Sequence, residues 1–83
     1  MQIQLRFFAA LRETVGTATL ALDTQAANVG ALRDELIARG GVWADGLARG
    51  RALRASVDQV MASDDTPLRD GAEVAFFPPV TGG

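Results

Sequence analysis

Both ends of the chain alternate apolar and polar residues with a period of two, and one amphipathic segment lies between them. QIQLRFF, at the start, has an apolar residue at every second position. AEVAFF, near the end, puts Val74 and Phe76 on one side of a strand and Ala75 and Phe77 on the other. Because side chains alternate between the two faces of a strand, both segments predict strands that bury one face.

The segment NVGALRDELIARGG predicts the main helix. Its apolar residues recur at helical spacing, at Val29, Leu32, Leu36 and Ile37. Asn28 precedes this stripe and is a good N-cap, since its side-chain oxygen can accept a hydrogen bond from a free N–H of the first turn. Gly40 can adopt the left-handed conformation that ends a helix.

The segments between the first strand and this helix carry weaker patterns. AALRETVG is too short for a stable helix by itself and predicts a helical turn that ends at Gly16. TATLAL alternates again, with Ala18, Leu20 and Leu22 on one face. It predicts a second strand that forms a hairpin with the first.

The second half of the chain is expected to return to the sheet. VWADGLARGRAL contains two glycines and predicts an irregular stretch, in which Trp43 and Leu47 cap one edge of the core. RASVDQVMA predicts a short strand, with or without a turn in it, and SDDTPLRDG is rich in turn residues. A right-handed crossover carries the helix across one face of the sheet. The order predicts an α+β fold, with a small mixed sheet wrapped around one main helix.

Composition limits the chemistry that the chain can perform. Its 83 residues predict one domain, because a chain of this size builds a single modest core. It has no Cys and no His, so it lacks a thiol nucleophile and an imidazole, and we expect no metal site. The net charge of −2 argues against a nucleic-acid partner, which requires a basic surface. All eight basic residues are Arg, so the N-terminal amine is the one amine that could accept an acyl group.

The N-terminal segment does not resemble a targeting signal. MQIQLRFFAALRE lacks a basic leader followed by an unbroken apolar stretch, which a signal peptide requires. No segment approaches the ~20 apolar residues of a membrane-spanning helix. We therefore expect a cytoplasmic protein without a membrane partner.

The closing segment, LRDGAEVAFFPPVTGG, is the most informative part of the chain. It combines a turn Asp-Gly, a strand that ends in Phe-Phe, and a Pro-Pro-Val-Thr-Gly-Gly tail. In this combination it resembles the small, sulfur-carrying subunits of molybdopterin synthase (MoaD-like proteins). LRFFAALRETVG and the Trp of GVWADGLARGRAL are similar to that family too, so the resemblance covers nearly the whole chain. It implies a ubiquitin-like β-grasp fold, with residues 1–83 as a single domain and 78–83 as a flexible Gly-Gly tail.

The terminal carboxylate needs activation before it can react. Gly83 is ionised at neutral pH, because an α-carboxyl group has a pKa of roughly 3.5, and a carboxylate is a poor acyl donor. The resemblance implies that an adenylyltransferase adenylates Gly83 with ATP and Mg²⁺, and that sulfur then replaces AMP to leave a thiocarboxylate. The thiocarboxylate would donate sulfur to a cyclic pterin precursor, building the molybdopterin dithiolene. The chain itself would bind no cofactor and would be a non-catalytic subunit of a sulfurtransferase complex.

The composition of the tail suits entry into a narrow channel. Thr81 and Gly82 would thread toward the partner's active site, and a glycine without a Cβ lets the backbone lie close to a ligand. Pro78 and Pro79 keep the base of the tail extended. The alternative is a frayed terminus without a role, which accounts for the glycines but not for the AFFPPVT before them.

A partner must hold the domain while the tail reaches its active site. Alternation leaves Phe8 and Phe77 on the outward face, and the resemblance makes their strands parallel neighbours, with Met61 close to both. Exposed adjacent apolar side chains are typical of a binding patch. We assign partner binding to Phe8, Met61, Phe77, Pro78, Pro79 and Val80. The alternative is that one or both rings pack under the irregular segment around Trp43.

The resemblance implies two protein partners, the large catalytic subunit of molybdopterin synthase and the activating adenylyltransferase. A dithiolene has two sulfur atoms and each carrier brings one, which fits a heterotetramer of two small and two large subunits. Three alternatives remain: a sulfur carrier for thiamin or cysteine synthesis, a ubiquitin-like modifier conjugated to Lys, and an interaction domain with an inert terminus. The first would share the tail chemistry and differ in the docking patch, and the free Gly-Gly disfavours the last.

One position departs from the family's pattern. The family tends to have Val-Asn-Gln where this chain has Val57-Asp58-Gln59. An ionised Asp only accepts hydrogen bonds, whereas Asn also donates them. A bond that the family's Asn donates to a partner or to a turn would therefore be lost here. We expect Asp58 to pair with a nearby Arg instead.

Overall fold

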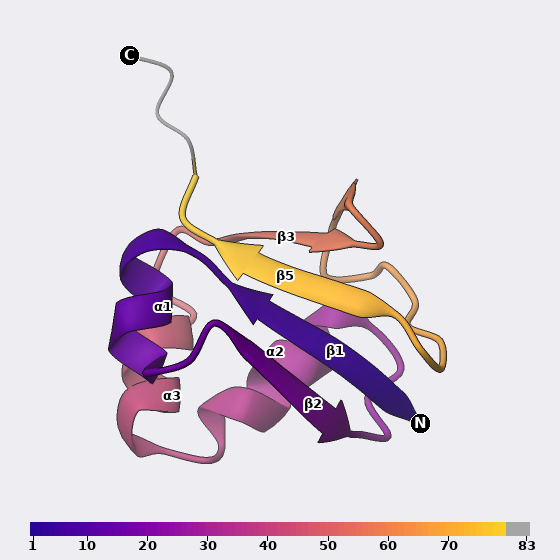
Figure 1. The fold of residues 1–83 in the computed structure, drawn as a ribbon, viewed down its shortest axis with the longest axis horizontal. Coiled ribbons are helices and arrows are strands. Elements are labelled where there is room, and N and C mark those ends of the chain that lie inside the picture. Colours follow the sequence, from indigo (N-terminus) through magenta and orange to yellow (C-terminus); the bar gives the residue numbers. More distant parts are fainter. Residues whose placement is uncertain (80–83) are drawn as a thin grey trace.

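The computed structural model describes residues 1–79, within which the chain forms a five-stranded sheet and three helices (Figure 1). The strands lie in the order β2-β1-β5-β3-β4. Their bounds are β1 Gln2–Phe7, β2 Thr19–Asp23, β3 Arg54–Val57, β4 Val60–Ala62 and β5 Glu73–Phe77. β1 and β5 run parallel at the centre of the sheet, and the other neighbouring strands are antiparallel. The predicted α+β class with a mixed sheet is confirmed, and RASVDQVMA is a hairpin of two strands.

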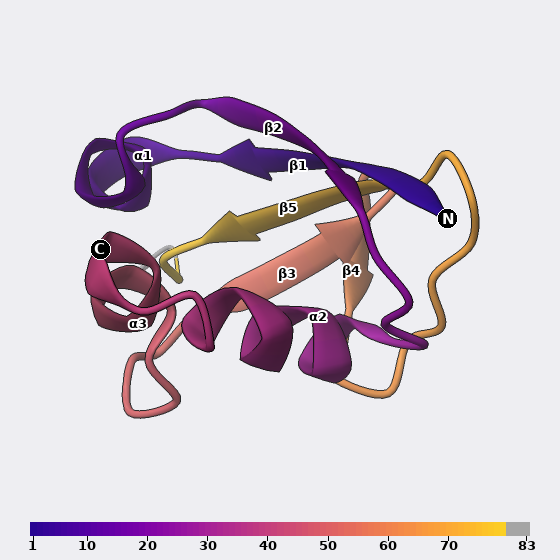
Figure 2. The same ribbon diagram turned by 90° about the horizontal axis from the view of Figure 1, so that it is seen from below.

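The helices cover one face and one end of the sheet. Figure 2 shows α2 (Val29–Ile37) lying across one face, with α1 (Ala9–Val15) and α3 (Gly41–Leu47) next to each other at one end. We call the face that α2 covers the inner face and the opposite one the outer face. Among residues 1–79, no helix has the length and apolar character to cross a membrane.

Helix α2 begins as predicted and ends earlier than predicted. The side chain of Asn28 caps its N-terminus by accepting a hydrogen bond from the Ala31 N–H at 2.8 Å. The helix ends at Ile37 rather than continuing to the glycines. Gly40 does have a positive φ, of 74°, but it forms the N-cap of α3 instead of stopping α2.

Helices α1 and α3 correct two sequence-based expectations. AALRETVG predicts only a helical turn and VWADGLARGRAL an irregular stretch, yet each contains a seven-residue helix. Short helices gain their stability from tertiary packing rather than length, and Leu11 and Val15 bury one side of α1. Gly16 ends α1 as predicted, with φ 83° and its N–H donating to the Arg12 carbonyl at 3.0 Å. On α3, a Cβ at Gly46 would lie 3.0 Å from Leu11, so glycine permits this close helix contact.

The inner face of the sheet supplies most of the core. Ile3 and Phe7 of β1, and Val74 and Phe76 of β5, are each at most 1% exposed, as their alternation predicts. The apolar stripe of α2 packs against these side chains. The burial of these apolar side chains is the main source of stability for a chain of this size.

Helix α3 closes one edge of this core. Leu47 is fully buried, and the Trp43 ring lies 5.6 Å from that of Phe7. Both residues therefore take the place predicted for them, although on a helix. The phenylalanine that packs against Trp43 comes from the inner face of the sheet.

Candidate functional site

The outer face of the sheet brings together the side chains that the sequence singles out. Phe7 of β1 pairs with Phe76 of β5, so the next residues along the two parallel strands, Phe8 and Phe77, are neighbours. Phe8 is 44% exposed and Met61, on β4, is 57% exposed. All three side chains line one hollow on this face. The structure thus groups Phe8, Met61 and Phe77, and we call them the outer-face patch.

Small side chains at the centre of the face explain why it is hollowed. Met61 pairs with Ser56 of β3, and Ser56 pairs with Ala75 of β5. The small Ser56 and Ala75 side chains leave a depression of about 390 Å³ between the larger apolar groups at its edges. A shallow apolar socket of this kind suits a protruding side chain of another protein.

The edge of the patch is polar. The Arg6 guanidinium lies 5.8 Å from the centre of the Phe8 ring, and its Nη1 lies 3.6 Å from Oε2 of Glu73. An apolar centre with a charged rim is the usual composition of a protein interface. Among the described residues, no group of three or more His, Cys, Asp or Glu side chains gathers to hold a metal ion.

The β3–β4 turn fixes the position of Met61. Asp58 and Gln59 have φ values of 50° and 70°, the left-handed pair of a two-residue type I′ hairpin turn. Oδ1 of Asp58 accepts a hydrogen bond from the Glu73 N–H at 3.0 Å, and Oδ2 accepts one from Arg69 at 3.3 Å. The Glu73 N–H, and then Arg69, hold the pKa of Asp58 below its ordinary value. The expected pairing of Asp58 with an Arg is confirmed, and its role is to tie the turn to β5.

The tail begins where the patch ends. Pro78 and Pro79 directly follow Phe77, the last residue of β5. The other predicted tail residues, Val80, Thr81, Gly82 and Gly83, lie outside the described residues. Six residues from 78 to 83 can span at most roughly 20 Å when extended. A protein that binds the outer-face patch therefore has the chain terminus within roughly that distance of Phe77.

Two arginines that the sequence does not single out hold the molecule together near α3. Arg33 of α2 is 8% exposed, and it donates hydrogen bonds to the carbonyls of Leu47, Ala48 and Arg51. Arg49 bridges Asp34 and Asp64 at 2.9 and 2.8 Å. Both side chains come from polar positions of the sequence pattern, and their partners depend on tertiary structure, so no local signal reveals them.

Comparison with known proteins decides the family. The profile of the ThiS family matches residues 5–83. The chain belongs to the ThiS family. This ThiS-family chain is 48% identical over 81 residues to the molybdopterin synthase sulfur carrier subunit of Escherichia coli (strain K12), covering 98% of this chain and 99% of that protein. The resemblance drawn from the closing segment is confirmed.

Solved structures of similar shape establish the β-grasp fold of this ThiS-family chain. Small archaeal modifier protein 1 of Haloferax volcanii superposes with a TM-score of 0.77 at 26% identity, and the match covers 100% of both chains. A complex of subunits 1 and 2 of the molybdopterin-converting factor from Helicobacter pylori contains a chain with a TM-score of 0.67 at 22% identity, again covering 100% of both. The predicted ubiquitin-like architecture is thus confirmed.

Proposed function

We propose that this chain is the sulfur carrier subunit of a molybdopterin synthase and that Gly83 carries the sulfur. The observation that supports this most strongly is the 48% identity, over nearly the full length of both proteins, to a sulfur carrier subunit of that enzyme. The tail residues Pro-Pro-Val-Thr-Gly-Gly stand at the end of the matched region. In this proposal the outer-face patch binds the partner protein, because the patch adjoins the start of the tail.

The proposed cycle alternates between two forms of the terminus. The Gly83 carboxylate attacks the α-phosphate of ATP and releases pyrophosphate, which leaves an acyl adenylate. Sulfide (HS⁻), supplied by a sulfur donor, displaces AMP and yields the thiocarboxylate. The thiocarboxylate sulfur attacks a carbon of the pterin precursor and displaces an oxygen substituent, which forms a thioester between Gly83 and the pterin. Water then cleaves the acyl–sulfur bond, which leaves the sulfur on the pterin and restores the carboxylate. Every catalytic group for these steps is supplied by partners, and ATP and Mg²⁺ are bound by the activating enzyme.

Two partners follow from this cycle. The large synthase subunit receives the loaded tail, and an adenylyltransferase receives the unloaded one. The Helicobacter pylori neighbour was solved as a complex of subunits 1 and 2, which supports pairing with a large subunit. Two sulfurs per dithiolene favour an assembly of two small and two large subunits. Because adenylation consumes ATP, we propose that the cycle runs in the cytoplasm.

A mass measurement tests the proposal directly. The intact chain is incubated with ATP, Mg²⁺, the adenylyltransferase and a sulfur source. We expect the mass to rise by one oxygen-to-sulfur exchange, located on Gly83 by fragmentation. Mixing the loaded chain with the large subunit and the pterin precursor should return the original mass as product forms. A chain that never gains this mass would contradict the proposal.

Altering the terminus should separate loading from folding. We expect deletion of Gly83, or addition of one Ala after it, to abolish adenylation while the unfolding temperature stays the same. The reason is that the buried core of the described residues ends at Phe76, and that glycine has no side chain to add to a core. Pyrophosphate release and thermal unfolding, measured on the same preparations, check both halves. Normal adenylation without Gly83 would mean that another residue carries the reactive group, which contradicts the proposal.

A ubiquitin-like modifier is the second candidate, because the structure resembles small archaeal modifier protein 1 with a TM-score of 0.77. A modifier would form stable isopeptide bonds with target proteins. A denaturing gel of cells that express a tagged chain would then show a ladder of conjugates. A carrier instead gives the thiocarboxylate mass on the free chain and no ladder.

A further inference from the structure

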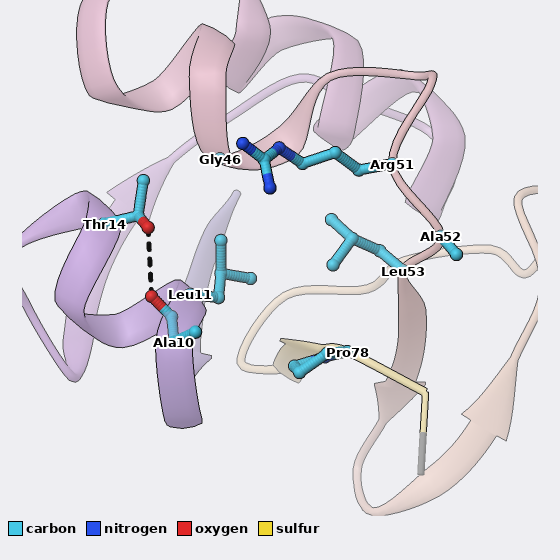
Figure 3. Close-up of a pocket in the computed structure, with 8 residues that line it drawn as sticks. All are labelled: Ala10, Leu11, Thr14, Gly46, Arg51, Ala52, Leu53 and Pro78. Atoms are coloured by element: carbon cyan, nitrogen blue, oxygen red, sulfur yellow. Dashed lines mark hydrogen bonds between the residues drawn. The ribbon is translucent and has the colours of Figure 1, made fainter. Parts of the chain in front are cut away.

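A second hollow lies beside the root of the tail, on the same end of the molecule as α1 and α3 (Figure 3). It has a volume of about 170 Å³. Its walls come from α1, α3, the loop before β3, and the first tail residue. We call it the tail-root pocket, lined chiefly by Ala10, Leu11, Gly46, Arg51, Leu53 and Pro78.

The lining is apolar with one charged group. Figure 3 shows Leu11 and Leu53 facing each other across the pocket, with Pro78 at one end and the Arg51 guanidinium at the other. The Thr14 hydroxyl also borders the pocket, but it already donates to the Ala10 carbonyl at 3.0 Å. Among residues 1–79, no carboxylate lines the pocket. It therefore offers a lipophilic space with a cation at its rim.

The Arg51 side chain has donors to spare. Its Nε donates to the Asp45 carbonyl at 2.6 Å, which holds the guanidinium over the pocket. Within residues 1–79, neither Nη atom of Arg51 lies within ion-pair distance of a carboxylate. A guanidinium can form two parallel hydrogen bonds with one carboxylate, so Arg51 is suited to an acidic group of another molecule.

The walls of the pocket are held in place before anything binds. Gly46 brings α3 so close to α1 that a Cβ would lie 3.0 Å from Leu11 and 3.3 Å from Thr14. Buried Arg33 fixes the loop that carries Arg51, because it binds the Arg51 carbonyl at 3.2 Å and two carbonyls just before it. A pre-formed cavity binds a partner with a smaller loss of conformational entropy than one that must form on binding.

The position of the pocket indicates what fills it. If the tail is threaded into a channel of the large subunit, as the proposed function requires, the mouth of that channel must surround Pro78. Pro78 is itself part of the pocket wall, so the channel rim comes to lie directly over the pocket. An apolar cavity of ~150 Å³ can hold a benzene ring, so a volume of about 170 Å³ accommodates one aromatic or branched aliphatic side chain.

We propose that the tail-root pocket receives one apolar side chain from the channel rim of the large synthase subunit, and that Arg51 pairs with a carboxylate beside it. This inference rests on the proposed function. It adds a second anchor at Pro78, next to the outer-face patch that contains Phe77. Two anchors at the root of the tail fix both its position and its direction of entry.

Filling the pocket tests the apolar half of the proposal. In the full chain, Ala10→Phe adds a ring at the pocket wall, and Ala31→Phe adds the same ring on an exposed position of α2 as the matched control. We expect Ala10→Phe to weaken binding to the large subunit at least ~10-fold, and Ala31→Phe to change it less than ~2-fold. Calorimetric titration measures the affinity, and urea unfolding verifies that both variants fold. Unchanged affinity for folded Ala10→Phe would overturn the inference.

Reversing the charge tests the other half. Arg51→Glu should weaken binding at least ~10-fold and reduce its dependence on salt, because it removes the pair with the partner's carboxylate. Arg39→Glu makes the same change outside the pocket and should have little effect. If the two variants weaken binding equally, the affinity depends on the net charge of the chain and not on Arg51 itself, which contradicts the proposal.

Two further measurements decide between occupants. If the pocket variants impair adenylation but leave large-subunit binding intact, the pocket belongs to the activating enzyme and our assignment is wrong. If removing residues 80–83 from the free chain shifts the NMR signals of Leu11 and Leu53, the tail itself fills the pocket and the assignment is again wrong. The mass gain of the wild-type chain at Gly83 is a separate test. If that mass gain is absent, the proposed function is wrong. If the mass gain is present and the pocket variants bind the large subunit as wild type does, only this inference is wrong.

Discussion

Phe76 and Phe77 are consecutive and identical in chemistry, yet they belong to different parts of the molecule. Phe76 is 1% exposed in the core between the sheet and α2. Phe77 is only partly buried and lines the hollow of the outer face. The pleat of one strand thus sends the first ring into the core and the second to the outer face.

The two faces differ in how tightly they are filled. On the inner face, β1 and β5 present large apolar side chains that are almost completely buried. On the outer face, Ser56 and Ala75 occupy the middle, and Phe8 and Met61 remain 44% and 57% exposed. A fold that leaves this much apolar surface uncovered gains little stability from it. We infer that the inner face determines stability and the outer face determines binding.

The largest expected effect comes from breaking the inner face. Phe76→Asp removes a buried ring, which alone costs about 3–5 kcal/mol in a core, and buries an unpaired charge in addition. A domain of this size has a total stability of about 4–12 kcal/mol, at roughly 0.05–0.15 kcal/mol per residue. We expect most molecules to be unfolded at room temperature, as judged by circular dichroism. A cooperative, native-like unfolding curve would contradict the assignment of Phe76 to the core.

The same substitution one residue later should have the opposite outcome. Phe77→Asp keeps the fold, but we expect it to weaken binding to the large subunit by about 2 kcal/mol or more, roughly 30-fold, because it removes a central apolar anchor. Titration calorimetry and urea unfolding measure the two effects separately. Val42→Asp is the matched control, since Val42 is 47% exposed on α3 and lies outside the patch. An unfolded Phe77→Asp, or equal binding losses for both variants, would refute the separation of the faces.

A smaller change compares neighbouring residues of β4. Met61→Ala should weaken binding by about 1 kcal/mol, roughly 5-fold, because Met61 lies at the edge of the hollow. Val60 is more exposed, at 69%, but it does not line the hollow. Val60→Ala should therefore leave the affinity unchanged. The same titrations check both variants. A greater loss of affinity for Val60→Ala than for Met61→Ala would mean that the partner binds the other side of the β-hairpin.

The sequence predicts the two faces well because alternation is a local property of a strand. The inward positions of Val74 and Phe76, and the outward position of Phe77, follow from a period of two. The closeness of Phe8, Phe77 and Met61 needs the strand order, which came from the family resemblance and not from the pattern.

Other features were not accessible from the pattern. Helices α1 and α3 are seven residues long, and they form because Gly46 lets them pack against each other. Arg33 is an ordinary polar residue in the helical pattern of α2, and only the folded chain puts three carbonyls around its guanidinium. Interactions of this kind join segments that are distant along the chain, so no local periodicity carries them.

The smallest expected effect concerns the turn that supports Met61. Because the Glu73 N–H, and then Arg69, hold the pKa of Asp58 below its ordinary value of 3.8, the carboxylate favours the folded state above that pH. Its contribution should be lost as the pH falls through the lower pKa of the folded chain.

We therefore compare wild type with Asp58→Asn, which tolerates the left-handed turn but does not titrate. The advantage of wild type in urea midpoint should be constant from pH 7 to about pH 5 and should shrink toward pH 2. In Arg69→Gln, the hydrogen bond from the Glu73 N–H to Asp58 remains. The urea midpoint of this variant, relative to Asp58→Asn, should therefore still fall in acid, but by less than that of wild type. An advantage that is independent of pH, or that grows in acid, would mean that the carboxylate of Asp58 does not hold the turn to β5.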